Sequence, residues 1–399
     1  MFRLLLLTLL VLPLSESKAQ LRQRKTVVFG ELIGRTDSNE FKLLTRNGVI
    51  PVVRGAQNKT FEIVERSQMR IVVRFTEQAR RDSRTPGSVI IQFFESERKL
   101  ISALILDEVD VAYLESEASA FEVQKSNNNI LPLPISADKN KAKMVVYNHR
   151  NPLFKNKKQR EAISYGINHD YIINRVLSAG KATIARGPFD DNSPLYNSGM
   201  KSYRHDPRLA LQLLGNLGWR DKNLDGILEK KNRKFKFKLL YQKGMRLDEA
   251  ISRVIKINLI KLGVDVQPIP VTKREMSQRL REGAFDAALI EQTFTEELAS
   301  IQAFFGRVGK LNFMAFSNPK LENYFEFYQA TDSKAQKKTL IKSMQQVIND
   351  EQPVTFLYFK WLTHYLVNVN RFENFRYMEG LNSGKIKPFE EWRTKFPTP

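Results

Sequence analysis

Histidines are the side chains of this sequence that could most readily transfer protons or bind a metal ion, and the chain holds four of them. They lie far apart, with no HExxH segment and no paired carboxylates at ligand spacing. This spacing predicts structural or exposed histidines rather than a metal site. The four are His149, His169, His205 and His364.

A segment rich in aspartate and asparagine offers a second possible metal site. Asp221, Asn223 and Asp225, followed by Gly226, match the first half of a calcium-binding loop. The last position of such a loop requires a bidentate glutamate, but this chain has Asn232 there. We therefore expect a structural turn, and the sequence predicts no metal site.

Nucleophilic catalysis has equally little support. The chain has no cysteine, so thiol nucleophiles, thiolate metal ligands and disulfides are excluded. It also has no GxSxG element and no phosphate-binding P-loop. We expect a protein that is not an enzyme, with no catalytic residue and no cofactor.

Lysine and arginine together number 64 and aspartate and glutamate 43, which gives a net charge of +21. Such a charge can indicate nucleic-acid binding, but here the basic residues are scattered instead of grouped in a recognition motif. We expect a solvated basic surface and no nucleic-acid partner. Attraction to anionic lipid or to an acidic ligand is the alternative.

The N-terminal segment has the pattern of a secretory signal. Arg3 precedes an apolar run from Leu4 to Leu12, which is too short to span a bilayer. Small residues at Ser17 and Ala19 predict cleavage before Gln20. No cysteine follows that position to carry a lipid anchor, and no later run approaches the roughly 20 apolar residues of a transmembrane helix. The expected product is soluble and periplasmic, with no stable membrane insertion.

The elements that would position a site alternate between strands and helices. With 399 residues, of which 42% are hydrophobic, the chain is longer than one core usually accommodates, so two lobes are expected. Alternation of strands with amphipathic helices is typical of an α/β lobe whose sheet is covered by helices. The clearest predicted run comprises strand 235–241, helix 247–262, strand 264–269, helix 273–281 and strand 285–290, and an earlier unit comprises strand 89–93, helix 96–106 and strand 109–113.

Several short motifs follow one another after Tyr147 in a recognisable order. Each one is weak by itself, but together they resemble the family 5 solute-binding proteins of bacterial ABC importers, the peptide, dipeptide and nickel-binding type. The motifs are Asn151-Pro152 with Arg160-Glu161-Ala162-Ile163, Tyr203-Arg204-His205-Asp206-Pro207, Leu262-Gly263-Val264-Asp265, Gly283-Ala284-Phe285-Asp286, Phe316-Ser317-Asn318-Pro319 and Pro353-Val354.

The resemblance implies a two-lobed type II periplasmic-binding fold in which a ligand lies between the lobes. It assigns residues 1–19 to the signal peptide, 20–148 and the returning segment 359–399 to lobe I, and 149–358 to lobe II. The chain would cross between lobes at Tyr147-Asn148 and near the strand from Val354 to Tyr358. Family members usually carry a much longer segment before the region that begins near Phe61, so the first lobe is expected to be abbreviated.

The resemblance also suggests where a ligand would bind. In peptide-binding members a tryptophan and an aspartate follow the strand that corresponds to residues 285–290. This chain has Gln292 in place of the tryptophan and Thr295 near the aspartate position, with Glu291 or Glu296 as possible acidic substitutes. An ordinary solvent-facing loop is the alternative. The expected ligand contacts are Tyr147, Asn148, Gln292, Thr293, Phe294, Thr295 and Glu296.

Two functions fit these observations. The first is a monomeric binding protein that delivers a peptide or similar small solute to the permease subunits of an ABC importer. The second is a relative that has lost solute transport and acts as an interaction protein of the cell envelope. The altered loop, the short first lobe and the basic surface are the features that suggest the second function.

Overall fold

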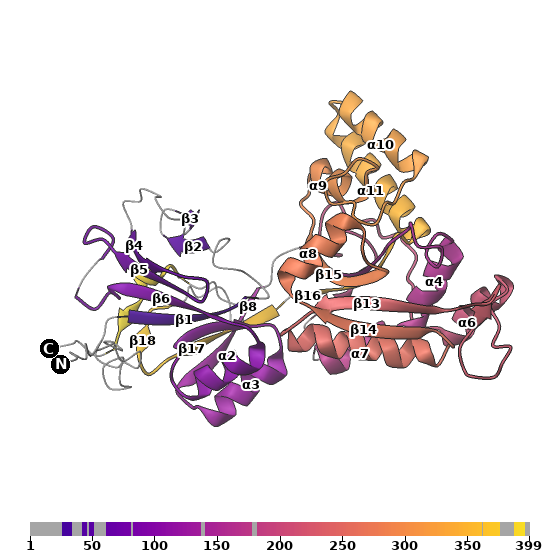
Figure 1. The fold of residues 1–399 in the computed structure, drawn as a ribbon. Helices are drawn as coiled ribbons and strands as arrows, with labels where there is room; N and C mark the ends of the chain where they lie inside the picture. Colours follow the sequence, from indigo (N-terminus) through magenta and orange to yellow (C-terminus); the bar gives the residue numbers. More distant parts are fainter. Residues whose placement is uncertain are drawn as a thin grey trace, which may run out of the picture.

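The computed structural model describes residues 26–33, 42–45, 48–51, 61–80, 83–136, 140–177, 182–360, 362–375 and 387–395. These residues form two lobes, each built on its own β-sheet (Figure 1). The predicted signal segment lies outside the described residues. Within the described part of the chain, every helix is too short or too polar to cross a bilayer. The expected two-lobed α/β architecture is confirmed.

The first lobe contains a seven-stranded sheet with the order β4-β5-β6-β1-β7-β17-β8. Its central strand β1 pairs in parallel with β6 and β7, while β17 is antiparallel to β7 and β8. A separate hairpin joins β2 and β3. The strands are β1 Thr26–Leu32, β2 Lys42–Thr45, β3 Gly48–Pro51, β4 Phe61–Arg66, β5 Arg70–Phe75, β6 Ser88–Phe94, β7 Val111–Leu114, β8 Ile130–Ser136 and β17 Leu362–Asn368.

Alternate residues of β1 face two different cores, as expected for the two-residue period of a strand. Val28 packs in the core between the sheet and two helices, α2 (Glu97–Ile105) and α3 (Glu117–Ser126). Both helices lie below the sheet in Figure 1. Val27 packs in the core of the opposite face. The first sheet is therefore buried on both sides.

The C-terminal part of the chain closes the opposite face of the first sheet. Trp392 has no exposed surface and lies in the core that contains Val27. Arg371 forms an ion pair with the buried Asp110, whose other oxygen accepts a hydrogen bond from the backbone N–H of Val28 at 2.9 Å. The elements of this part are β18 Phe372–Glu373, the 3-10 helix η2 Phe389–Glu391 and β19 Arg393–Thr394.

The second lobe contains a six-stranded sheet with the order β10-β16-β9-β15-β13-β14. Strands β13, β14 and β15 run parallel, and β9 pairs antiparallel with both β15 and β16. The predicted alternation of strands and helices from residue 235 onward is confirmed. The strands are β9 Lys141–Tyr147, β10 Ala182–Ile184, β13 Lys236–Gln242, β14 Asp265–Val271, β15 Ala287–Thr293 and β16 Val354–Lys360.

Helices cover both faces of the second sheet. Helices α4, α6 and α7 contribute to one apolar core, and α8 to α11 contribute to the other (Figure 1). The hairpin of β11 (Glu229–Lys230) and β12 (Arg233–Lys234) precedes β13. The helices are α4 Lys157–Gly166, α5 His169–Tyr171, the π-helix η1 Ile172–Val176, α6 Pro207–Asn216, α7 Arg246–Ile260, α8 Lys273–Glu282, α9 Leu298–Phe305, α10 Pro319–Ala330 and α11 Lys334–Glu351.

Local signals placed several of these elements correctly. Asn156, a residue type that favours helix N-caps, caps α4 by accepting a hydrogen bond from the backbone N–H of Lys158. Asp206 caps α6, with Pro207 in the first turn. The aspartate-rich segment before β11 is a turn in which Asp221 accepts the backbone N–H of Gly226 at 2.9 Å.

The chain crosses between the sheets at two places, and one of them differs from the expected place. One crossing lies between β8 and β9, and the other lies between β16 and β17. The crossing expected near the strand from Val354 to Tyr358 follows the end of that strand, β16. The crossing expected at Tyr147-Asn148 is instead at the opposite end of β9, because β9 pairs with β16 inside the second sheet. Asn148 follows the end of β9 that points away from the crossing.

Candidate functional site

A cavity of about 340 Å³ lies where the two lobes meet. Glu115, directly after β7, is its lining residue from the first lobe, and the second lobe contributes residues of β9, β15, α7 and α8. Part of the wall is apolar, formed by Met245, Met276, Leu280, Leu289 and Phe313. The polar lining consists of Glu115, Lys141, Lys143, Gln242, Asp248, Lys273, Ser277, Glu291 and Gln292, and the apolar Ile290 also lines the cavity.

Lysines and carboxylates on one side of the cavity form an ionic cluster. Lys143 is 4% exposed, and its ammonium group contacts the carboxylate of Asp248, which is 6% exposed. The same ammonium group lies 4.0 Å from a carboxylate oxygen of Glu291. Lys141 pairs with the other oxygen of Glu291 at 2.9 Å. The strand β9 therefore presents two cations, and α7 and β15 present the matching carboxylates.

These groups are ionised near neutral pH. Burial raises the pKa of Asp248 to about 6, and the adjacent Lys143 charge opposes that rise. Burial alone would lower the pKa of Lys143, but Asp248 and Glu291 outweigh it and hold that pKa above its usual value. Burial would likewise raise the pKa of Glu291, yet Lys143 and Lys141 hold it at about 2. The cluster thus carries fixed charges of both signs.

A lysine of the second lobe connects the cluster to the first lobe. Lys360, at the end of β16, donates a hydrogen bond through its ammonium group to the backbone carbonyl of Glu115. Burial lowers the pKa of Lys360, and the charges of Glu115 and Glu291 partly offset this effect. The carboxylate of Glu115 itself makes no hydrogen bond or ion pair with the residues that the structure describes. It therefore faces the cavity as an acceptor available to a ligand.

A second contact joins the lobes beside the cavity. The backbone N–H of Glu97, in α2, donates to the carbonyl of Gly244 at 3.0 Å. Arg246 pairs with Glu122 of α3 at 2.8 Å. Gly244 has a φ of +88°, and a Cβ there would lie 2.4 Å from the carbonyl oxygen of Glu95. Glycine is required at this position because a side chain would push the two lobes apart.

Two of the expected ligand contacts lie away from the cavity. Tyr147 has no exposed surface, stacks on Phe154, and shares a hydrogen bond of 2.6 Å with Thr355. Asn148 is buried, and its amide donates to the carbonyls of Gly283 and Phe285 at 2.9 Å. Both residues stabilise the far end of β9, so the expectation that they contact a ligand at a crossing has to be corrected.

The loop after β15 is divided between core, cavity and surface. Gln292 lines the cavity, and its side-chain N–H donates to the carbonyl of Thr293 at 2.8 Å. Phe294 packs against Phe304 and Phe305 in the core, so it cannot offer a surface to a ligand here. The other three predicted contacts, Thr293, Thr295 and Glu296, are exposed. The carboxylate of Glu296 accepts a hydrogen bond from the hydroxyl of Ser193.

Five charged residues of the cavity were not predicted from the sequence: Glu115, Lys141, Lys143, Asp248 and Lys273. A usable signal was present, because Lys141 and Lys143 interrupt a strand whose following residues are all apolar. A charged side chain in such a strand is buried only with a partner. Asp248, between Leu247 and Ile251 on the apolar side of α7, gave a similar signal. Glu115 gave no local signal beyond its place after a predicted strand.

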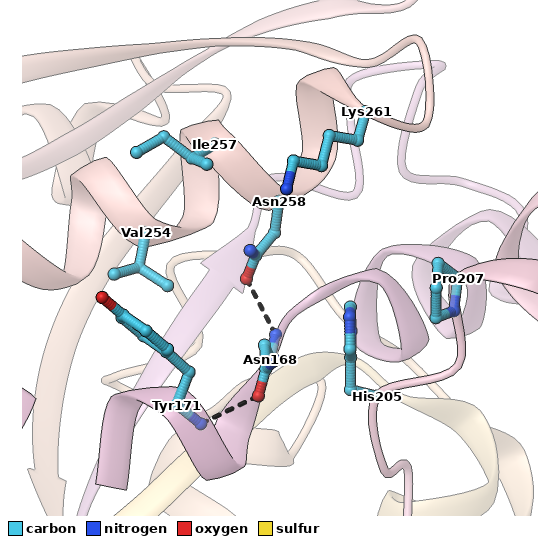
Figure 2. A pocket seen from close by; sticks show the side chains of 8 residues that line it. All are labelled: Asn168, Tyr171, His205, Pro207, Val254, Ile257, Asn258 and Lys261. Carbon is cyan, nitrogen blue, oxygen red and sulfur yellow. Dashed lines mark hydrogen bonds between the residues drawn. The ribbon is translucent and has the colours of Figure 1, made fainter. Parts of the chain in front are cut away.

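A different hollow, of about 470 Å³, lies on the second lobe between α5 and α7 (Figure 2). Figure 2 shows Asn168 between Tyr171 and His205, where its backbone N–H donates to the side-chain oxygen of Asn258 at 2.9 Å. Its lining is mainly apolar and includes no residue of the first lobe. The lining residues are Asn168, Tyr171, His205, Pro207, Val254, Ile257, Asn258 and Lys261.

Comparison with known proteins gives a family match over more than half of the chain. Residues 60–305 match the model of the bacterial extracellular solute-binding proteins, family 5. The oligopeptide-binding protein AppA of Bacillus subtilis is 27% identical over 220 residues, which are 53% of this chain and 40% of that protein. The chain thus spans less than half the length of this curated relative.

Solved structures share the fold. The structure of Bacillus subtilis AppA in complex with a nonapeptide superposes with a TM-score of 0.71 at 21% identity, covering 84% of this chain and 66% of that one. NikZ from Campylobacter jejuni in complex with Ni(L-His) gives 0.69 at 17% identity, covering 87% and 73%. The type II two-lobed fold expected from the motif order is confirmed.

Proposed function

This chain belongs to the family 5 bacterial extracellular solute-binding proteins, and we propose that it binds a peptide or similar small solute between its lobes for an ABC importer. The observation that carries the proposal is the charged cavity at the lobe junction. It contains fixed charges of both signs and the carboxylate of Glu115, which makes no hydrogen bond or ion pair with the described residues. AppA, a relative of this chain, has been solved with a nonapeptide.

The composition of the cavity suits a zwitterionic solute. A peptide carries an ammonium group, a carboxylate and amide groups that both donate and accept hydrogen bonds. Glu115 can accept from an ammonium group, and Gln292 can pair with an amide. The volume of about 340 Å³ is within the range of about 300–1,000 Å³ that small-molecule sites occupy.

Binding would bring the lobes together because the cavity takes residues from both. A ligand that contacts Glu115 on one lobe and Gln292 on the other binds best when the two are close. Such a ligand shifts the population toward a closed arrangement, which the permease could recognise. We propose that the described residues from 26 to 136 and from 362 to 395 form one lobe, and that those from 140 to 360 form the other. Both boundaries differ from the positions expected from sequence.

The proposal includes the cellular setting expected from sequence. The signal pattern of residues 1–19 supports export to the periplasm, and the absence of cysteine in the sequence supports a protein without a lipid anchor. We propose a monomer that works with permease subunits, without catalysis and without a cofactor.

A ligand screen tests the proposed function. Peptides, nickel–histidine complexes and sugars are compared by thermal shift, since a ligand at about 100 times its Kd adds about 2.7 kcal/mol of stability. We expect a peptide to raise the Tm. In titration calorimetry, Glu115→Gln should weaken that peptide at least tenfold because an acceptor for an ammonium group has lost its charge.

Glu108→Gln is the matched control, since Glu108 is an exposed carboxylate of the same lobe and does not line the cavity. It should bind the peptide as the wild type does. The proposal fails if no compound of any class raises the Tm, or if Glu115→Gln binds with unchanged affinity.

A further inference from the structure

A hollow of about 730 Å³ lies at the end of the second lobe that is remote from the first lobe. It is lined by Lys236 at the start of β13 and by Asn148 after β9, whereas Gln242 and Lys141 at the opposite ends of these strands line the junction cavity. Six of its lining residues are cations, and we call it the basic hollow. They are Arg150, Arg233, Lys234, Lys236, Lys238 and Arg279.

Acidic residues neutralise the basic hollow only in part. Three of the cations have a carboxylate partner, in the pairs Lys234–Asp225, Lys236–Asp265 and Arg279–Glu275. The other three make no ion pair with any residue that the structure describes. These unpaired cations are Arg150, Arg233 and Lys238.

The single carboxylate in the lining is occupied in holding the wall together. One oxygen of Asp286 accepts from the amide of Asn151 at 2.8 Å, and the other accepts from the backbone N–H of Lys238 at 2.9 Å. Asp286 therefore fixes the loop after β9 against β13. It adds one negative charge beside the three cations that have no carboxylate partner.

One of the unpaired cations is already held in place. The guanidinium of Arg150 donates a hydrogen bond to the carbonyl of Phe313 at 3.1 Å. It also lies close to Gly283, where a Cβ would be 3.2 Å from a terminal nitrogen of the guanidinium. Its remaining N–H groups are available to a ligand. Because Arg150 comes from the loop after β9 and Arg233 from the β11–β12 hairpin, the positive charge reaches the hollow from separate segments. A multiply charged anion could contact several segments at once.

We propose that the basic hollow binds a ligand that carries two or more phosphate groups. Phosphates combine high negative charge with oxygens that match the paired N–H groups of arginine, whereas one carboxylate could not pair with all three of the unpaired cations. The site is separate from the proposed solute cavity, and it gives part of the +21 net charge a specific role. The phosphates can belong to a soluble polyphosphate or to lipid headgroups.

Paired charge reversals test this proposal. Arg233→Glu with Lys238→Glu reverses two exposed cations of the basic hollow, and Lys256→Glu with Lys334→Glu reverses two exposed cations elsewhere. Each pair lowers the net charge by the same amount, so a general electrostatic attraction would weaken equally in both. The probes are tripolyphosphate, followed by titration calorimetry, and vesicles of phosphatidylglycerol or phosphatidylcholine, followed by sedimentation.

We expect the wild type to bind at least one of two probes, tripolyphosphate and phosphatidylglycerol vesicles. It should not bind phosphatidylcholine vesicles. The first variant should bind at least tenfold more weakly, and the second should stay within about twofold of the wild type. Binding of tripolyphosphate identifies a soluble source, and binding of vesicles alone identifies a lipid source. Arg233→Gln with Lys238→Gln should give a smaller loss without introducing repulsion. The proposal is overturned if the wild type binds neither probe, or if both charge-reversed variants weaken equally.

Discussion

Replacing Lys143 with methionine is expected to lower the free energy of unfolding by about 3–5 kcal/mol, as is usual when one partner of a buried ion pair is removed. The methionine fills most of the same volume but leaves the carboxylate of Asp248 buried without its cation. Glu291 keeps its ion pair with Lys141 at 2.9 Å, so Asp248 is the one carboxylate of the cluster that loses its cation. Urea unfolding followed by circular dichroism measures the change.

Two controls separate the buried charge from the loss of a lysine. Lys143→Met combined with Asp248→Leu should regain most of the lost stability because no uncompensated charge remains. Lys99→Met breaks the exposed pair with Glu95, whose side chains are 64% and 63% exposed, and should cost at most about 1 kcal/mol. Equal losses for Lys143→Met and Lys99→Met would contradict this account of the cluster.

Trp392→Ala should destabilise the first lobe by about 3–5 kcal/mol, the usual cost of removing a large buried aromatic side chain. The indole ring has no exposed surface and lies 4.9 Å from the ring of Phe389 and 5.7 Å from that of Phe372. Its N–H donates to the carbonyl of Lys387 at 2.9 Å. The C-terminal part of the chain should then detach from the sheet and become accessible to protease.

Trp392→Phe should cost less than the alanine change because an aromatic ring remains in the core. Phe121→Ala on α3, where the phenylalanine is 53% exposed, should change stability by no more than about 0.5 kcal/mol. If Trp392→Ala were as mild as Phe121→Ala, the C-terminal part would not be an essential component of the first lobe.

Local sequence patterns predicted the elements of the second lobe well. The apolar stripe from Leu247 to Leu262 predicted a helix that the structure places at Arg246–Ile260. Capping at Asn156 and at Asp206 was predictable because each acts on backbone N–H groups within a few residues. Apolar periodicity from Asp170 to Leu177 is typical of one helix, but the segment forms a short α-helix followed by a π-helical turn, a change that the periodicity does not reveal.

The candidate site was harder to predict because its residues meet only through long-range pairing. Lys143 and Asp248 are 105 positions apart in sequence, and they meet because β9 enters the second sheet between β15 and β16. The apolar residues from Met144 to Tyr147 at the end of β9 would suit the core of either lobe. The sequence pattern therefore does not show whether the first crossing comes before or after β9. Tyr147 was expected to contact a ligand because the crossing was expected beside it, but it is a core residue.

Closure of the lobes on a ligand tests the central claim most directly. The chain has no cysteine, so Glu65→Cys on the first lobe and Glu326→Cys on the second can carry spin labels at exposed, defined positions. Pulsed electron resonance then measures the distance between them with and without the peptide identified by thermal shift. We predict that the distance distribution changes to a narrower one when peptide is added, and that Glu115→Gln requires more peptide for the same change. A distribution that stays the same while the peptide is bound would contradict solute binding between the lobes.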